Sequence, residues 1–83
     1  MNRIETIKTR LIDAFSPTIC DVIDDSDQHI GHAGSQNGAG HFTIKIQAAV
    51  FAGKSRVIIH REIYQVLIDL MPETIHALRI LLV

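Results

Sequence analysis

The sequence has one cysteine, no excess of basic residues and no long apolar run. A small domain held together by disulfides needs cysteines in pairs, so Cys20 alone predicts a reduced, cytoplasmic protein. Eight Lys and Arg residues against nine Asp and Glu residues give a net charge of -1, without the basic surface typical of nucleic-acid-binding domains. The first ten residues lack the apolar core of a signal peptide. No apolar run approaches the ~20 residues that cross a bilayer, so no membrane segment is expected.

Patterns of catalytic residues are missing as well. There is no Ser/His/Asp or Cys/His arrangement with a third orienting group, no glycine loop with P-loop spacing, and no carboxylate pair beside an evident pocket. The sequence therefore predicts a protein that is not an enzyme. Its 83 residues suit a single domain, 1–83. A domain of this size buries only about 60–65% of the surface of the unfolded chain.

Two stretches have the spacing of amphipathic helices. In residues 2–15 apolar side chains recur every three or four positions, and Asn2 can cap the first turn. A second helix follows the turn at 51–55, with Ser55 as its N-cap. Apolar residues before His60 are expected in a separate short helix. The expected buried stripe of the second helix consists of Ile59, Ile63, Val66, Leu67 and Leu70.

Three stretches favour β-strands: residues 18–25, 41–49 and 74–83. The middle one alternates cleanly, with Phe42 on one side and Thr43 on the other. The order α-β-β-α-α-β predicts an α+β fold, a three-stranded mixed sheet covered on one face by helices. A right-handed helical crossover makes the third strand parallel to the second.

Histidines gather around the long loop between the first two strands. His29 and His32 lie in the loop, in the stretch DQHIGHAG, and His41 begins the second strand. Loops of about fifteen residues within a compact domain are usually functional or disordered. The predicted topology places this loop and the start of the third strand, with His76, at one end of the sheet. All four histidines can therefore converge.

Converging imidazoles indicate a candidate metal site. Neutral imidazole is a good ligand for zinc, copper and iron. Two histidines alone leave a zinc site incomplete, because such sites normally have three or four protein ligands. Two histidines can instead complete one iron of a [2Fe-2S] cluster whose other iron is held by thiolates. In that case a partner must supply the thiolates.

The sequence resembles the BolA-like family. The resemblance lies in the loop HIGHAG followed by GHF, in FAGKSRVIIHREIY, and in ETIHALRI. It implies a fold similar to a class II KH domain. The chain departs from the family's R-H-R helix pattern, because it reads Ile59-His60-Arg61 there. No partner contact is therefore carried over to Ile59.

The resemblance implies partnership with a monothiol glutaredoxin. In that family a BolA-like protein, a glutaredoxin and glutathione share a bridging [2Fe-2S] cluster. By the motif match His76 is the strand ligand and His32 the loop ligand, with His29 and His41 as alternatives. The isolated chain is expected to hold no cofactor and to be a monomer or a weak homodimer.

A second function class stays open at this point. BolA-like proteins include members that act in transcription, so the alternative is a KH-like nucleic-acid-binding transcriptional regulator. Against it, the only local basic cluster is Lys54, Arg56 and Arg61.

Overall fold

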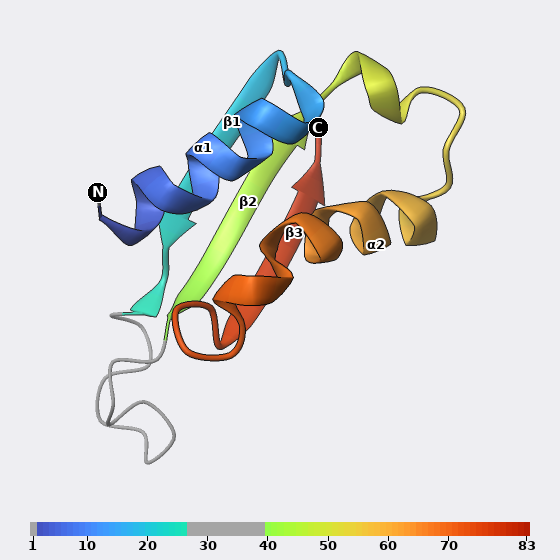
Figure 1. Ribbon diagram of the computed structural model, residues 1–83. Helices are drawn as coiled ribbons and strands as arrows, with labels where there is room; N and C mark the ends of the chain where they lie inside the picture. The colour runs from blue at the N-terminus through green and yellow to red at the C-terminus, as the bar shows by residue number, and fades with distance from the viewer. Residues whose placement is uncertain (1, 27–39) are drawn as a thin grey trace.

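The computed structural model describes residues 2–26 and 40–83. These residues form helices on one side of a three-stranded sheet (Figure 1). In chain order the elements are α1 (Arg3–Phe15), β1 (Ile19–Asp24), β2 (His41–Gln47), the 3-10 turn η3 (Ala49–Phe51), α2 (Arg56–Leu67), the 3-10 turn η4 (Ile68–Leu70) and β3 (Ala77–Leu82). The predicted α+β class with a mixed sheet is confirmed.

Both predicted helix caps are present. The side chain of Asn2 accepts a hydrogen bond of 2.8 Å from the backbone N–H of Glu5, and Ser55 accepts one of 3.3 Å from Ile58. These bonds satisfy amide groups that have no partner within the first turn of a helix. The separate short helix expected before His60 is wrong, because the helix capped by Ser55 runs unbroken from Arg56 to Leu67.

The sheet has the order β1-β2-β3, with β2 in the centre. β1 runs antiparallel to β2, and β3 runs parallel to it, as the topology predicted. The register pairs Asp24 with Phe42 and His41 with Ala77. The end of β1 and the starts of β2 and β3 therefore lie together at one end of the sheet (Figure 1).

Among the described residues, helices cover one face of the sheet and leave the other open. On β2, Phe42, Ile44 and Ile46 are buried against the helices, while Lys45 and Gln47 are exposed on the opposite face. The rest of the core is Ile7, Leu11, Phe15, Ala48, Phe51, Ile59, Ile63, Leu67 and Ile75. Successive strand side chains therefore alternate between this core and the opposite face.

An ion pair joins the two helical regions of the covering layer. The Arg10 guanidinium on α1 donates to both carboxylate oxygens of Asp69 in η4, at 2.5 and 2.8 Å. These hydrogen bonds hold the pKa of the Asp69 carboxyl below its ordinary value. Both side chains are well exposed, so we assign the pair a role in orienting η4 rather than a large share of stability.

The last strand is shorter than the sequence pattern indicated. The amides of Thr74 and Ile75 both donate to the carbonyl of Leu70, at 2.9 Å. These bonds hold the chain in a turn, so the ladder of β3 begins only at Ala77. Within the described residues no helix is long and apolar enough to cross a membrane.

Candidate functional site

His41 and His76 lie side by side where β2 and β3 begin. Their ring centroids are 5.5 Å apart and the ring planes are tilted by 54°. His41 is the first residue of β2, and His76 directly precedes β3. The predicted convergence of these two histidines is therefore observed, although most of β2, all of α2 and the following turn separate them in the chain. His29 and His32 lie outside the described residues.

The exposure of the two rings differs from what the alternation of strand side chains predicts. Alternation places His76 with the packed Leu78 and His41 with the exposed Lys45, but His76 is exposed and His41 is half-buried. His76 precedes the first ladder residue of β3, so the strand period does not yet govern its side chain. The more accessible imidazole is thus that of His76, directly before β3.

Backbone hydrogen bonds fix both histidines in place. The carbonyl of Gly40 accepts from the amide of His76 at 2.7 Å and from the amide of Ala77 at 3.1 Å. The amide of His41 donates to the Ser26 hydroxyl at 3.1 Å, and its carbonyl accepts from the amide of Asp25 at 2.7 Å. The end of β1 and the start of β3 are therefore both tied to the residues that carry the pair.

The separation of the rings suits two ligands of one metal ion. Imidazoles bound at about 2.0–2.1 Å to a tetrahedral ion have ring centroids roughly 5 Å apart. A spacing of 5.5 Å also falls among ordinary ring contacts, so this distance makes the pair a candidate set of metal ligands and no more. No group of three or more His, Cys, Asp or Glu side chains in 2–26 and 40–83 is arranged to hold a metal.

Cys20 does not join this donor set. Its register partner is Ile46, near the far end of β2, whereas the histidines lie at the start of that strand. The five residue steps from His41 to Ile46 correspond to about 17 Å of strand. Burial raises the pKa of the Cys20 thiol, which keeps it in the protonated form that binds metal poorly. Cys20 is partly buried and packs against the core, as a small apolar side chain does.

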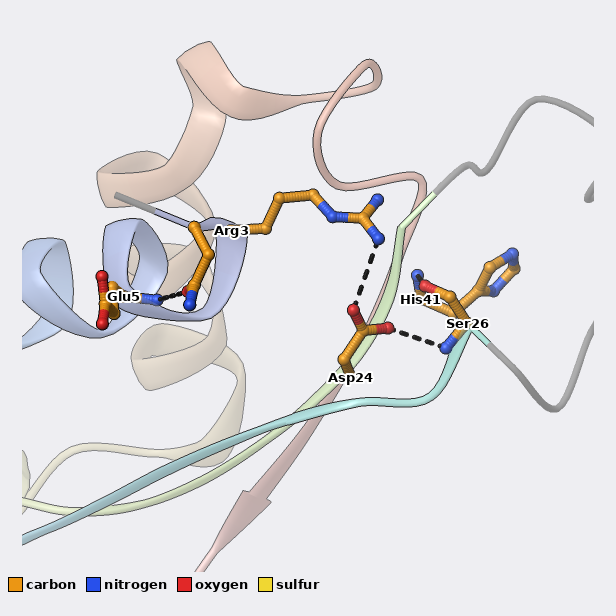
Figure 2. A network of polar contacts seen from close by, with 6 residues as sticks. Arg3, Glu5, Asp24, Ser26 and His41 are labelled. Carbon is orange, nitrogen blue, oxygen red and sulfur yellow. Dashed lines mark hydrogen bonds and ion pairs between the residues drawn. The ribbon is translucent and has the colours of Figure 1, made fainter.

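A charged network supports the same end of the sheet (Figure 2). The Arg3 guanidinium on α1 lies 3.3 Å from one carboxylate oxygen of Asp24. The other carboxylate oxygen of Asp24 accepts a hydrogen bond of 2.9 Å from the amide of Ser26. Burial raises the pKa of Asp24, but hydrogen bonds from Ser26 and the charges of Arg3 and His41 outweigh it and leave that pKa below its ordinary value. The carboxylate thus stabilises the junction between α1 and the end of β1.

A pocket of about 360 Å³ adjoins His41 on the open face of the sheet. Its lining comes from the end of β1, the start of β2 and the start of β3: Asp25, His41, Phe42, Thr43, Ala77, Leu78 and Arg79. Sequence reasoning missed Asp25, Thr43 and Arg79. Two of them could have been found from the strand pairing, because Thr43 and Arg79 are register partners and so lie on the same face of the sheet.

A family model for BolA-like proteins matches residues 11–83. The chain belongs to the BolA-like family. The model's match includes the loop, both candidate strand histidines and α2, so it covers the segments on which the resemblance was based.

Individual relatives agree with this assignment. The chain is 40% identical over 82 residues to a Sinorhizobium protein named for its place in the cobS 5' region, covering 96% of this chain and 88% of that one. It is 37% identical over 76 residues to the DNA-binding transcriptional regulator BolA of Vibrio cholerae, covering 92% and 69%. The solved BolA domain of SufE1 from Arabidopsis thaliana superposes with a TM-score of 0.83 at 36% identity, covering 99% and 91%.

Replacing Gly40 should disrupt the histidine pair. A Cβ at Gly40 would collide with the backbone carbonyl of Thr74 and the ring of Phe42. We expect Gly40→Ala to lower the free energy of unfolding by more than about 2 kcal/mol, as for overpacked core sites. Urea denaturation checks this. Gly53→Ala is the control, because Gly53 has a φ of 79° but open space around it. If Gly40→Ala is no more destabilising than Gly53→Ala, the close approach is wrong.

The Asp24 network predicts a pH dependence of stability. Because the folded-state pKa of Asp24 is lowered, its contribution is present above the unfolded pKa of about 3.9 and is lost as the pH falls through the folded pKa. Asp24→Asn should therefore be less stable than the wild type at pH 7, by at most about 1 kcal/mol for this part-exposed pair. The difference should shrink in denaturation measured near pH 3. Asp21→Asn is the control, since exposed Asp21 makes no ion pair with another described residue; an equal effect there would contradict the role of Asp24.

Proposed function

We propose that this BolA-like protein is a non-enzymatic, cytoplasmic partner of a monothiol glutaredoxin, with which it shares a bridging [2Fe-2S] cluster in iron-sulfur trafficking or iron and redox sensing. The observation that carries the proposal is the 5.5 Å pair of His41 and His76. The pair lies at the end of the sheet where the chain enters and leaves 27–39, the segment that contains His29 and His32. Membership of the BolA-like family supports it independently.

The donor set explains why a partner is required. Two imidazoles are too few for a tight zinc site, but they match the histidine-bound iron of a cluster whose second iron has thiolate ligands. The only cysteine of the chain is Cys20, which lies away from the pair. The thiolates therefore come from the glutaredoxin and from glutathione. The cluster, when bound, supplies a redox-active iron-sulfur unit that can pass to another protein.

The histidines have different roles in this proposal. His76 is the strand ligand, because it is exposed and its backbone is fixed by Gly40. The second ligand is His32 by the family motif. His41 is the alternative that the structure favours by proximity, and His29 is the remaining one. Half-burial of His41 and the tie of its amide to Ser26 also suit a role in orienting the His76 ring.

Alanine variants of the four histidines test the assignment. The chain is mixed anaerobically with a monothiol glutaredoxin, iron, sulfide and glutathione, and the visible absorption and circular dichroism of the cluster are recorded. His76→Ala should abolish the change that the wild type causes, since it removes one of only two donors. His32→Ala should do so if the family motif holds, and His41→Ala should do so instead if proximity decides. His29→Ala should have no effect unless His29 is the loop ligand.

His60→Ala is the matched control. His60 is a half-buried histidine on α2, away from the pair. Its removal should leave the spectra unchanged. Wild-type spectra in the His76→Ala mixture would overturn the proposal, and so would a failure of the wild type to alter the glutaredoxin spectra.

Nucleic-acid binding is the second candidate. It is favoured by the name of the Vibrio cholerae relative, a DNA-binding transcriptional regulator. Arg56 and Arg61 are exposed on α2, and no ion pair joins either to another described residue. Against it, the chain has a net charge of -1.

Salt dependence tests this second candidate. If α2 engages phosphates, duplex DNA should bind with an affinity that falls steeply as salt rises, because each neutralised phosphate contributes about -0.9 to the log-log slope. Arg56→Gln with Arg61→Gln should reduce that slope by about 2. Fluorescence anisotropy from 50 to about 200 mM salt measures it. Absence of binding at low salt removes the candidate.

A further inference from the structure

The pocket beside His41 contains opposite charges that are not paired with each other. Asp25 and Arg79 both line it. The carboxylate of Asp25 accepts a hydrogen bond from the Thr43 hydroxyl. Arg79 is exposed and forms no ion pair or hydrogen bond with another described residue. The histidine pair does not require either charge.

The strand register sets the spacing of these charges. Thr43 on β2 is the register partner of Arg79 on β3, and neighbouring strands lie about 4.8 Å apart. Asp25, one residue beyond β1, reaches the same Thr43 from the other side. Asp25 is level with His41, whose carbonyl its amide bonds, so the anion and the cation lie diagonally on either side of Thr43 on the open face. Thr43 is only 6% exposed although it lies on that face. The carboxylate that it bonds is thus held at the sheet surface rather than free to swing toward Arg79.

This arrangement of a carboxylate and a guanidinium is complementary to a small ligand that carries both a positive and a negative charge. A lone anion would be repelled by Asp25, and a lone cation by Arg79. A group with a carboxylate next to an ammonium satisfies both, because the carboxylate faces Arg79 and the ammonium faces Asp25. The pocket volume of about 360 Å³ lies within the range usual for small-molecule sites, about 300–1,000 Å³.

We propose that the pocket formed by Asp25, Thr43 and Arg79 binds the zwitterionic α-amino-acid head group of a small peptide. The γ-glutamyl end of glutathione is such a group, and the choice of this peptide rests on the proposed function. The Arg79 guanidinium binds the α-carboxylate and the Asp25 carboxylate binds the α-ammonium. The rest of the peptide then extends toward the His41 side of the pocket.

Binding of S-methylglutathione to the metal-free chain tests this inference. Because the chain is metal-free and the methylated sulfur forms neither a thiolate nor a disulfide with Cys20, the result does not depend on cluster formation. Amide chemical shifts are followed by ¹⁵N NMR during titration. Saturable shifts are expected at Thr43, Ala77 and Arg79. If S-methylglutathione does not bind but cluster sharing is intact, only the pocket assignment is overturned. The histidine variants test cluster sharing independently of the pocket.

Variants and a modified ligand make the test specific. Arg79→Gln and Asp25→Asn should each weaken binding at least tenfold, and so should acetylation of the ligand's α-amino group. Arg61→Gln, which removes an exposed arginine on α2, should leave the affinity unchanged. Arg79→Gln alters an exposed side chain and should fold normally, so the test stands even if Asp25→Asn does not fold. The inference is overturned by no saturable shift in the wild type, by equal binding to Arg79→Gln, or by equal binding of the acetylated ligand.

Discussion

The parallel pairing of β3 with β2 is the constraint on which the candidate site depends. It is anchored where the carbonyl of Gly40 accepts from the amides of His76 and Ala77. That anchor sets the register in which His41 faces Ala77, and so it places His76 beside His41. Gly40 is suited to this position because any Cβ would meet the carbonyl of Thr74. A residue with no side chain thus brings together two imidazoles that are far apart in the sequence.

The one-sided packing of the sheet separates structure from candidate function. Phe42 and Ile44 are buried beneath the helices, so that face serves the core. Within residues 2–26 and 40–83 no helix covers the opposite face (Figure 1). The polar group of Asp25, Thr43 and Arg79 on that face is formed without loss of core packing. Because strand side chains alternate, the same three strands supply both faces. The histidine pair lies at the strand ends, where neither face governs the side chains.

Local signals in the sequence predicted the elements better than the environment of individual side chains. Asn2 and Ser55 were identified as caps because their side chains can bond to nearby amides, and such bonds need only a few residues of context. The mixed topology followed from the handedness of the crossover. Alternation did not predict the burial of single side chains: it places Thr43 on the face opposite the core, but Thr43 is only 6% exposed and its hydroxyl donates to the carboxylate of Asp25, one residue beyond β1. That contact depends on the register of β1 with β2, which sequence spacing alone does not specify.

The number of donors gives the proposed function its dependence on a partner. A site with three or four ligands from one chain would hold metal permanently, whereas two imidazoles bind an ion weakly. In the proposed function, thiolates from another protein complete the donor set that two imidazoles begin, so affinity would be a property of the complex. The half-buried His41 and the exposed His76 fit such a division, because one ring is held by the fold and the other faces an incoming partner. In the proposed function, a complete metal site on this chain would remove that dependence on the partner.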